Sequence, residues 1–195
     1  MISLDLLIQR ISKLPGLGAR SARRIALHLL KKREEQMAPL IHALQQAYQE
    51  VKKCHICGNF DDNSPCHICT NPKRKNDTLC IVADVSDLWA MERAQVFSGK
   101  YHILGGLLSA VDGMTPEKLN INSLGKRIEE ENMHEIVFAL SATIDGQTTM
   151  HYLMAHLKDL SLTFTTLAHG VPLGGELDYM DDGTLSLAYR ARQAV

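Results

Sequence analysis

Long hydrophobic runs are missing from this chain of 195 residues. No apolar stretch approaches the roughly 18 consecutive residues that a membrane-spanning helix needs. The opening segment, MISLDLLIQRISK, alternates apolar and polar side chains, whereas a secretory signal contains a continuous apolar segment. We therefore expect an intracellular, cytoplasmic protein with no membrane partner.

Motifs typical of several enzyme classes are missing as well. The glycine-rich stretches 105–106 and 170–175 are not followed by the Gly-Lys-Ser/Thr of a P-loop. Ser141 and Ser161 lack the setting of a nucleophile elbow. No constellation of His, Asp and Ser is evident. We interpret the scattered histidines as structural, namely His102, His134, His151, His156 and His169.

A large net charge is also absent, since 21 Lys/Arg and 22 Asp/Glu leave −1 at pH 7. The charges are nevertheless unevenly distributed. Residues 1–53 carry ten Lys/Arg and four Asp/Glu, for a net charge of +6, and the rest of the chain carries 11 and 18, for −7. A segment of this charge is typical of a surface that faces a polyanion, although a solvated helical surface has the same composition. Charge alone leaves both interpretations open.

Cysteine is scarce, with five residues, but four of them form the pattern C-x2-C-x8-C-x2-C. A tetrahedral zinc ion takes about four thiolate or imidazole ligands, and each CxxC turn presents two. A haem site needs His directly after a pair, and a thioredoxin-like CxxC normally stands alone, so neither fits. A reducing cytosol also favours metal binding over disulfides. We therefore predict one structural zinc ion per chain, with the ligands Cys54, Cys57, Cys66 and Cys69.

Three residues near this pattern have simpler interpretations. His55 and His67 lie between the cysteines of the two pairs, at positions that usually point away from the metal. We expect both at the surface or in hydrogen bonds and not on the ion. Cys80 stands in the apolar run LCIVA, so we interpret it as a small buried residue.

Apolar residues recur at helical spacing near the N-terminus. They predict a helix over about 4–14, a second that starts near residue 19 and ends in the charged run 31–35, and a third over about 40–51. Pro-Gly-Leu-Gly, residues 15–18, separates the first two helices. The sequence therefore predicts a helical hairpin with a tight turn.

The hairpin turn has the chemistry of a phosphate-binding site. Gly16 and Gly18 let a phosphate approach the backbone, and the next helix points its positive end outward. Arg20 and Arg24 lie four apart and share a helical face. We predict contacts to a nucleic-acid backbone, without base preference, from Lys13, Gly16, Gly18, Arg20, Arg23 and Arg24. A plain packing corner with solvated arginines is the alternative.

Strands and helices alternate after residue 78. Strands are expected at about 79–83, 101–104, 135–140 and 162–167. Helices are expected at about 86–96, 123–131 and 146–158, and residues 109–122 read as an irregular loop. This order is typical of a parallel sheet with helices on its faces. The predicted fold class is therefore α/β, preceded by a helical region and a cysteine knuckle.

Four stretches carry a resemblance that covers almost the whole chain: LPGLGARSA, the four-cysteine pattern, IVADVSDLWAMERAQVFSGKYHILGG and HGVPLGGELDYMDDGTLSLA. In this order and spacing the chain resembles the bacterial family of RecR recombination mediators. The resemblance implies a helix-hairpin-helix, a four-cysteine zinc finger, a Toprim domain and a C-terminal Walker-B-like segment. The expected boundaries are 1–53, 54–69, 77–172 and 173–195.

The resemblance also implies a function in recombinational DNA repair. RecR proteins form ring-like dimers or tetramers that encircle DNA. With RecO, and in some organisms RecF, they help to load RecA at single-strand gaps, in the cytoplasm at the nucleoid. The family's basic hairpin residues correspond to Arg20 and Arg24, and its zinc ligands correspond to the four cysteines.

The chain departs from catalytic Toprim domains at the metal site. Those domains hold magnesium with a Glu after the first strand and a later DxD motif, for phosphoryl chemistry. Here the Glu position is Ala83, and the DxD position is Ser-Ala-Thr at 141–143. We therefore expect no catalytic residues, and a scaffold with Asp84 and Asp145 as partner contacts. A magnesium-dependent Toprim nuclease or phosphotransferase is one alternative, and a zinc-dependent adaptor that binds only proteins is another.

Overall fold

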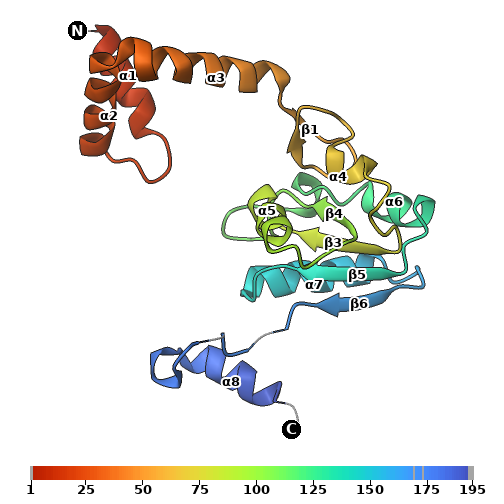
Figure 1. Ribbon diagram of the computed structural model, residues 1–195. Helices are drawn as coiled ribbons and strands as arrows, with labels where there is room; N and C mark the ends of the chain where they lie inside the picture. Colours follow the sequence, from red (N-terminus) through yellow and green to blue (C-terminus); the bar gives the residue numbers. More distant parts are fainter. Residues whose placement is uncertain (1, 169, 173, 193–195) are drawn as a thin grey trace. The chain divides into compact units, whose positions relative to one another are not determined.

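The computed structural model describes residues 2–168, 170–172 and 174–192, and it divides into two compact units, Met1–Val51 and Lys52–Val195 (Figure 1). His169, which we interpreted as structural, lies outside the described residues. None of the described helices is long and apolar enough to cross a membrane.

The first unit contains the expected helical hairpin. Helices α1 (Ile2–Ser12) and α2 (Ala19–Lys31) pack around the buried residues Ile11, Ala22 and Ala26. In the turn between them, Gly16 has φ +77°, a left-handed conformation that suits glycine. The apolar spacing and the Pro-Gly-Leu-Gly break therefore identified the hairpin correctly.

The connection from α2 to α3 is more regular than the sequence predicts. The charged run ends α2 as expected, but no loop follows. A π-helical turn, Arg33–Met37, leads directly into α3 (Ala38–Glu50). Helix α3 has no buried residue. Its apolar side chains are exposed instead, namely Leu40, Ile41, Leu44 and Tyr48.

The second unit is built on a four-stranded parallel sheet with the order β4–β3–β5–β6. The strands are β3 (Thr78–Val82), β4 (Lys100–Ile103), β5 (Glu135–Ala139) and β6 (Thr163–Thr166). The helices that alternate with them are α5 (Val85–Ala94), α6 (Leu124–Glu130) and α7 (Ile144–His156). The predicted alternation and the parallel sheet are confirmed.

Strand β3 shows how the sheet separates two cores. Leu79 and Ile81 belong to a core that they share with α6 and α7. Cys80 and Val82, the alternate residues, belong to a second core with Leu88 of α5 and with the cysteine knuckle. Because both faces are covered, the strand needs apolar residues at successive positions, which explains the run LCIV.

A short knuckle precedes the sheet in the sequence. Strand β1 (Lys52–Lys53) pairs antiparallel with β2 (Phe60–Asp61), and α4 (His67–Thr70) follows. The N–H of Ile103, the last residue of β4, donates to the carbonyl oxygen of Cys57 at 2.8 Å. The knuckle is thus attached to the carboxyl end of β4.

Two segments contain more structure than the sequence predicts. The loop 109–122 includes a 3-10 turn, η2 (Pro116–Lys118). The C-terminal residues form a 3-10 turn, η3 (Leu177–Tyr179), and an unexpected helix, α8 (Asp182–Arg190). Asp181 caps α8, since its carboxylate accepts the Thr184 N–H at 2.9 Å. Neither η3 nor α8 has a buried residue.

Candidate metal centre and nucleic-acid interface

Two CxxC turns bring four thiols into one cluster. The Sγ atoms of Cys54, Cys57, Cys66 and Cys69 all lie within 4.8 Å of one another. Cys57 and Cys66 are 3.5 Å apart, and Cys54 and Cys69 are 3.9 Å apart. Sulfurs around a tetrahedral zinc ion, with bonds of about 2.3 Å, lie about 3.8 Å apart. The cluster therefore fits one zinc ion. Four protein ligands leave no open coordination position, so the site is structural and not catalytic.

The hydrogen bonds and pKa values of the thiols are also those expected of ligands for a cation. Backbone N–H groups of Asn59 and Cys66 donate to the sulfurs of Cys57 and Cys54, at 3.4 and 3.3 Å. A hydrogen bond from Cys69 lowers the pKa of Cys57 to about 5. Burial raises the pKa of Cys66 to about 11, and the bond to Cys57 raises the pKa of Cys69. The Cys57 thiolate therefore forms readily, and Cys66 and Cys69 need a bound cation to ionise.

The two histidines of the knuckle bond to the polar loop and not to the cluster. His55 Nδ1 lies 2.8 Å from Ser64 Oγ, which also accepts the His55 backbone N–H at 3.1 Å. The Asp61 carboxylate accepts the His67 backbone N–H at 2.9 Å and contacts its ring. These bonds lower the pKa of Asp61 to about 2, and the bond from the His67 backbone has the largest effect. Both histidines therefore order the loop between the CxxC pairs.

Two side chains from helices of the α/β unit hold the knuckle. Trp89 Nε1 on α5 donates to Asn59 Oδ1 at 3.2 Å. Arg127 Nη1 on α6 donates to the carbonyl oxygen of Tyr101 at 2.8 Å. The same nitrogen donates to the carbonyl oxygen of Ile56 at 3.5 Å. Sequence reasoning missed both residues. The segment LGKRIEE reads as a solvated helix, and only folding brings Arg127 to the knuckle.

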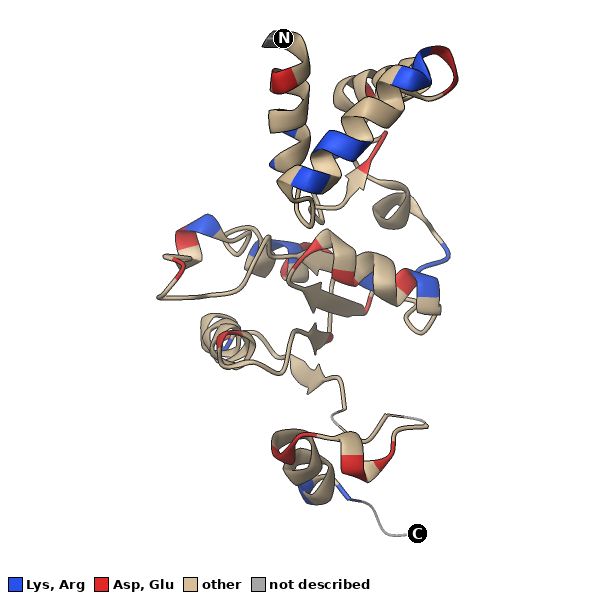
Figure 2. Ribbon diagram, turned by 90° about the vertical axis from the view of Figure 1, so that its left-hand side faces the viewer, with Lys and Arg blue, Asp and Glu red and all other residues tan. Residues whose placement is uncertain are grey.

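The predicted DNA-contacting residues lie at the turn and along α2, where Figure 2 shows basic residues from the first turn to the last. Arg20, Arg23 and Arg24 are exposed. Among the described side chains, none of these three has a carboxylate within 4 Å. Within the described part of the chain no side chain caps α2 at Gly18, so the first N–H groups of the helix are left for an anion.

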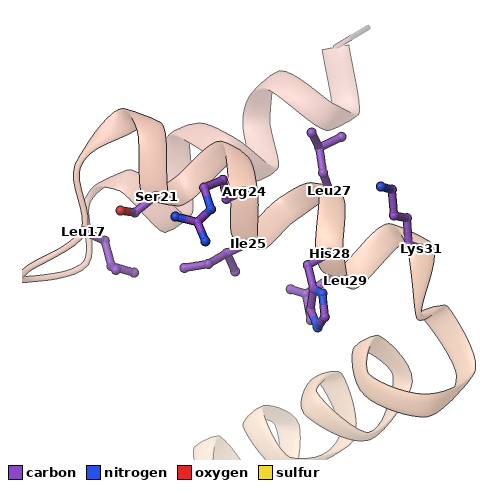
Figure 3. A pocket seen from close by; sticks show the side chains of 8 residues that line it. All are labelled: Leu17, Ser21, Arg24, Ile25, Leu27, His28, Leu29 and Lys31. Atoms are coloured by element: carbon purple, nitrogen blue, oxygen red, sulfur yellow. The ribbon is translucent and has the colours of Figure 1, made fainter.

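Arg20 and Arg24 lie one turn apart but have different surroundings. Arg24 lines a hollow of about 660 Å³ together with Leu17, Ser21 and Ile25 (Figure 3). Its aliphatic stem can cover this apolar surface while the guanidinium stays in water. Arg20 does not line the hollow. It extends from the first turn of α2, beside the uncapped helix start.

The positions of the Toprim metal ligands meet at the carboxyl edge of the sheet. Ala83 and Ser141, which follow the neighbouring strands β3 and β5, line one hollow of about 290 Å³ with Asp87. The Asp87 carboxylate accepts the Asp84 N–H at 3.0 Å, and the Asp84 carboxylate accepts the first N–H of α5, so both cap that helix. Asp145 lies in the first turn of α7. Within the described residues, the cysteines are the only cluster of metal-binding groups.

Four family models match the chain along its length. They are the RecR helix-hairpin-helix at residues 4–48, the RecR four-cysteine zinc finger domain at 51–71, the Toprim domain at 77–168 and the RecR C-terminal model at 170–193. The match at 51–71 and the four clustered thiols confirm the prediction of a zinc finger with one metal site.

Curated relatives match over almost the full length. The chain is 54% identical over 189 residues to the Recombination protein RecR of Rhodopseudomonas palustris, which covers 97% of this chain and 94% of that protein. The identity is 52% to the protein of the same name from Bartonella bacilliformis, with 97% and 94% covered. For Chelativorans sp. it is 51%, with 98% and 95% covered. A chain this similar to them over nearly all its residues belongs to the RecR family of recombination proteins.

Proposed function

We propose that this RecR protein is a clamp-like, DNA-binding mediator of recombinational repair. It works with RecO, and with RecF where one is present, to promote RecA loading at single-strand gaps. Membership of the family supports a role in recombinational repair, and the helix-hairpin-helix match supports DNA binding. One observation carries the proposal: exposed arginines, with no carboxylate partner or helix cap among the described side chains, lie beside the start of α2. Such a site contacts phosphates and does not read bases.

The DNA contacts in this proposal come from Lys13, Gly16, Gly18, Arg20, Arg23 and Arg24. A single hairpin offers few charges and binds weakly. In a homodimeric or homotetrameric ring, several hairpins act on one DNA molecule and gain by effective concentration. The apolar side chains of α3 support self-association, because Leu40, Ile41, Leu44 and Tyr48 are between 44% and 91% exposed.

In this proposal the α/β unit is a scaffold and a docking surface. Toprim chemistry needs several carboxylates around magnesium, but Ala83 and Ser141 stand at those positions, and Asp87 caps α5. Asp145 and, beside its capping role, Asp84 remain as partner contacts. The proposed domains are a DNA-binding region 1–53, a zinc finger 54–69, a Toprim domain 77–172 and a Walker-B-like segment 173–195. The protein acts in the cytoplasm, at the nucleoid.

RecA loading with RecO on gapped DNA, coated by single-strand-binding protein, tests the proposal. We expect the variant Arg20→Glu/Arg24→Glu to lose both DNA binding and stimulation of loading. The matched control Lys75→Glu/Lys158→Glu reverses two exposed charges of the other unit and should retain both. Full stimulation by the hairpin variant would instead support an adaptor that binds only proteins.

The enzyme alternative needs a separate assay. We expect no cleavage of labelled gapped DNA when the protein is incubated with magnesium. Magnesium-dependent cleavage that disappears in Asp84→Asn or Asp145→Asn would contradict the scaffold interpretation and support a nuclease.

A further inference from the structure

A second basic hollow lies within the α/β unit, between the knuckle and the loop that precedes α6. Its volume is about 420 Å³. The lining includes Lys53, His55, Lys118 and Asn120, and none of the lining residues is Asp or Glu. The ammonium groups of a concave site without carboxylates offer N–H donors and positive charge to an anion.

Lys53 forms the knuckle side of this hollow. It is the last residue of β1 and pairs with Phe60 of β2. A Cβ at Gly58 would lie 3.5 Å from Lys53 Cε, so the lysine stem crosses the backbone of the knuckle turn. No carboxylate lies within 4 Å of its ammonium group among the described side chains. The stem is thus positioned while the charge remains unpaired.

Lys118 forms the opposite side. It ends η2, and its Nζ donates to the carbonyl oxygen of Gly113 at 2.7 Å. This bond positions the ammonium group and uses one of its three N–H donors. Across the described chain, Lys118 has no carboxylate within 4 Å either. Two N–H donors are therefore left for a ligand.

The floor of the hollow is open backbone. Gly105 has φ +87°, and a Cβ built on it would meet nothing within 4 Å. The site therefore has room for a phosphate and its attached sugars to approach the main chain closely.

The zinc site offsets part of the positive charge of the lining. Zinc with four thiolates has a charge of −2, and Cys54 also lines the hollow. Lys53 is next to Cys54 in the chain. Lys118 comes from a distant segment, and its Nζ donates to the Gly113 carbonyl oxygen. The unused N–H donors of Lys118 are therefore left for an external anion.

We propose that this hollow binds a phosphate of the nucleic-acid backbone, so that each chain has one DNA contact in each of its two units. The inference rests on the proposed DNA binding. The two ammonium groups of the lining select for an anion, and a DNA-bound protein has phosphodiesters as the abundant anionic groups beside it. Without base-reading geometry, the contact adds affinity and salt dependence and no sequence preference.

Binding of the full-length protein to labelled gapped duplex, between about 50 and about 200 mM salt, tests the hollow. We would compare the wild type with Lys53→Gln/Lys118→Gln and with the control Lys75→Gln/Lys158→Gln. Each lost phosphate contact lowers the slope of log K against log salt by about 0.9. Both lysines hold the same phosphate, so the hollow variant should lose about 0.9 of slope. Between about 50 and about 200 mM salt, its affinity should then fall about 3.5-fold less than that of the control.

Further variants separate the possible failures. Lys118→Gln alone lies away from the cysteines, so it should keep the zinc content of the wild type while its slope falls toward that of the hollow variant. A hollow variant with the slope of the control, beside an Arg20→Glu/Arg24→Glu variant that loses binding, would overturn the hollow and leave the hairpin intact. A wild type that binds no DNA would overturn both proposals. A slope change seen only with Lys53→Gln, accompanied by zinc loss, would show a structural lysine and reject the site.

Discussion

Arg24 on α2 and Arg127 on α6 carry the same charged group in opposite surroundings. Arg24 is exposed and, among the described side chains, has no carboxylate within 4 Å. Arg127 is 6% exposed, its Nε donates to Glu131 Oε1 at 2.8 Å, and Lys100 shares that carboxylate at 2.7 Å. A buried charge without partners costs several kcal/mol, whereas an exposed charge is solvated by water and needs no partner. The buried arginine therefore stabilises the fold, and the exposed one is available to a ligand.

Loss of the metal site should have the largest effect, because it releases the knuckle that Arg127 holds. We expect Cys57→Ser to lower the free energy of unfolding by on the order of 5 kcal/mol. Thermal unfolding and zinc content measure this. A zinc-free protein with an unchanged Tm would contradict a structural role for the ion.

Removal of the buried charge on α6 should follow in size. Arg127→Met leaves Glu131 with one cationic partner, Lys100, and removes the bond to the Tyr101 carbonyl. The expected loss is about 3–5 kcal/mol in urea unfolding. Lys126→Met, on the exposed neighbour, should change stability by less than about 0.5 kcal/mol. Equal losses from both variants would remove the contrast between buried and exposed charge.

A pH titration sharpens the comparison through His102, which lies beside Arg127. Burial lowers the pKa of His102 to about 4, and the Arg127 charge adds to the effect. Below pH 6.5 the unfolded chain binds this proton and the folded chain does not. Stability should therefore fall by up to about 3 kcal/mol as pH drops from about 6.5 to about 4.

The control for this titration is His102→Gln, which removes the imidazole but keeps Cys57, whose lowered pKa of about 5 lies in the same pH range. The difference between wild type and variant isolates the histidine. Parallel curves of unfolding free energy against pH for the two proteins would show that His102 does not carry the effect.

The exposed arginines should have the smallest effect on stability. Arg20→Gln/Arg24→Gln breaks no described ion pair, so the free energy of unfolding should change by less than about 0.5 kcal/mol. Urea unfolding checks this. A buried hydrogen bond to a charged group is worth about 2 kcal/mol. A loss of stability of about that size or more would mean that these residues support the hairpin itself.

The sequence was informative where structure depends on neighbours in the chain. The spacing of Cys54, Cys57, Cys66 and Cys69 predicted the cluster, because a CxxC turn places its own sulfurs together. The run LCIV predicted a buried strand, and the structure shows that both of its faces are covered. Apolar periodicity and Gly16 likewise predicted the hairpin.

The features that the sequence did not reveal depend on contacts between distant segments. Arg127 reaches Ile56 across 71 positions, and no local pattern distinguishes it from the exposed Lys126. The hollow between Lys53 and Lys118 exists only once the knuckle meets the loop before α6. Asp84 was read as a partner contact, and its capping of α5 depends on side-chain geometry. Helix α8 was missed because its residues contribute nothing to either core.

The most direct test of the central claim is the salt dependence of DNA binding by the wild type and by Arg20→Gln/Arg24→Gln. If these exposed arginines contact phosphates, the slope of log K against log salt should fall by about 1.8 in the variant, while its unfolding curve stays the same. Equal slopes for the two proteins would contradict the claim and show that the basic face of α2 is only solvated.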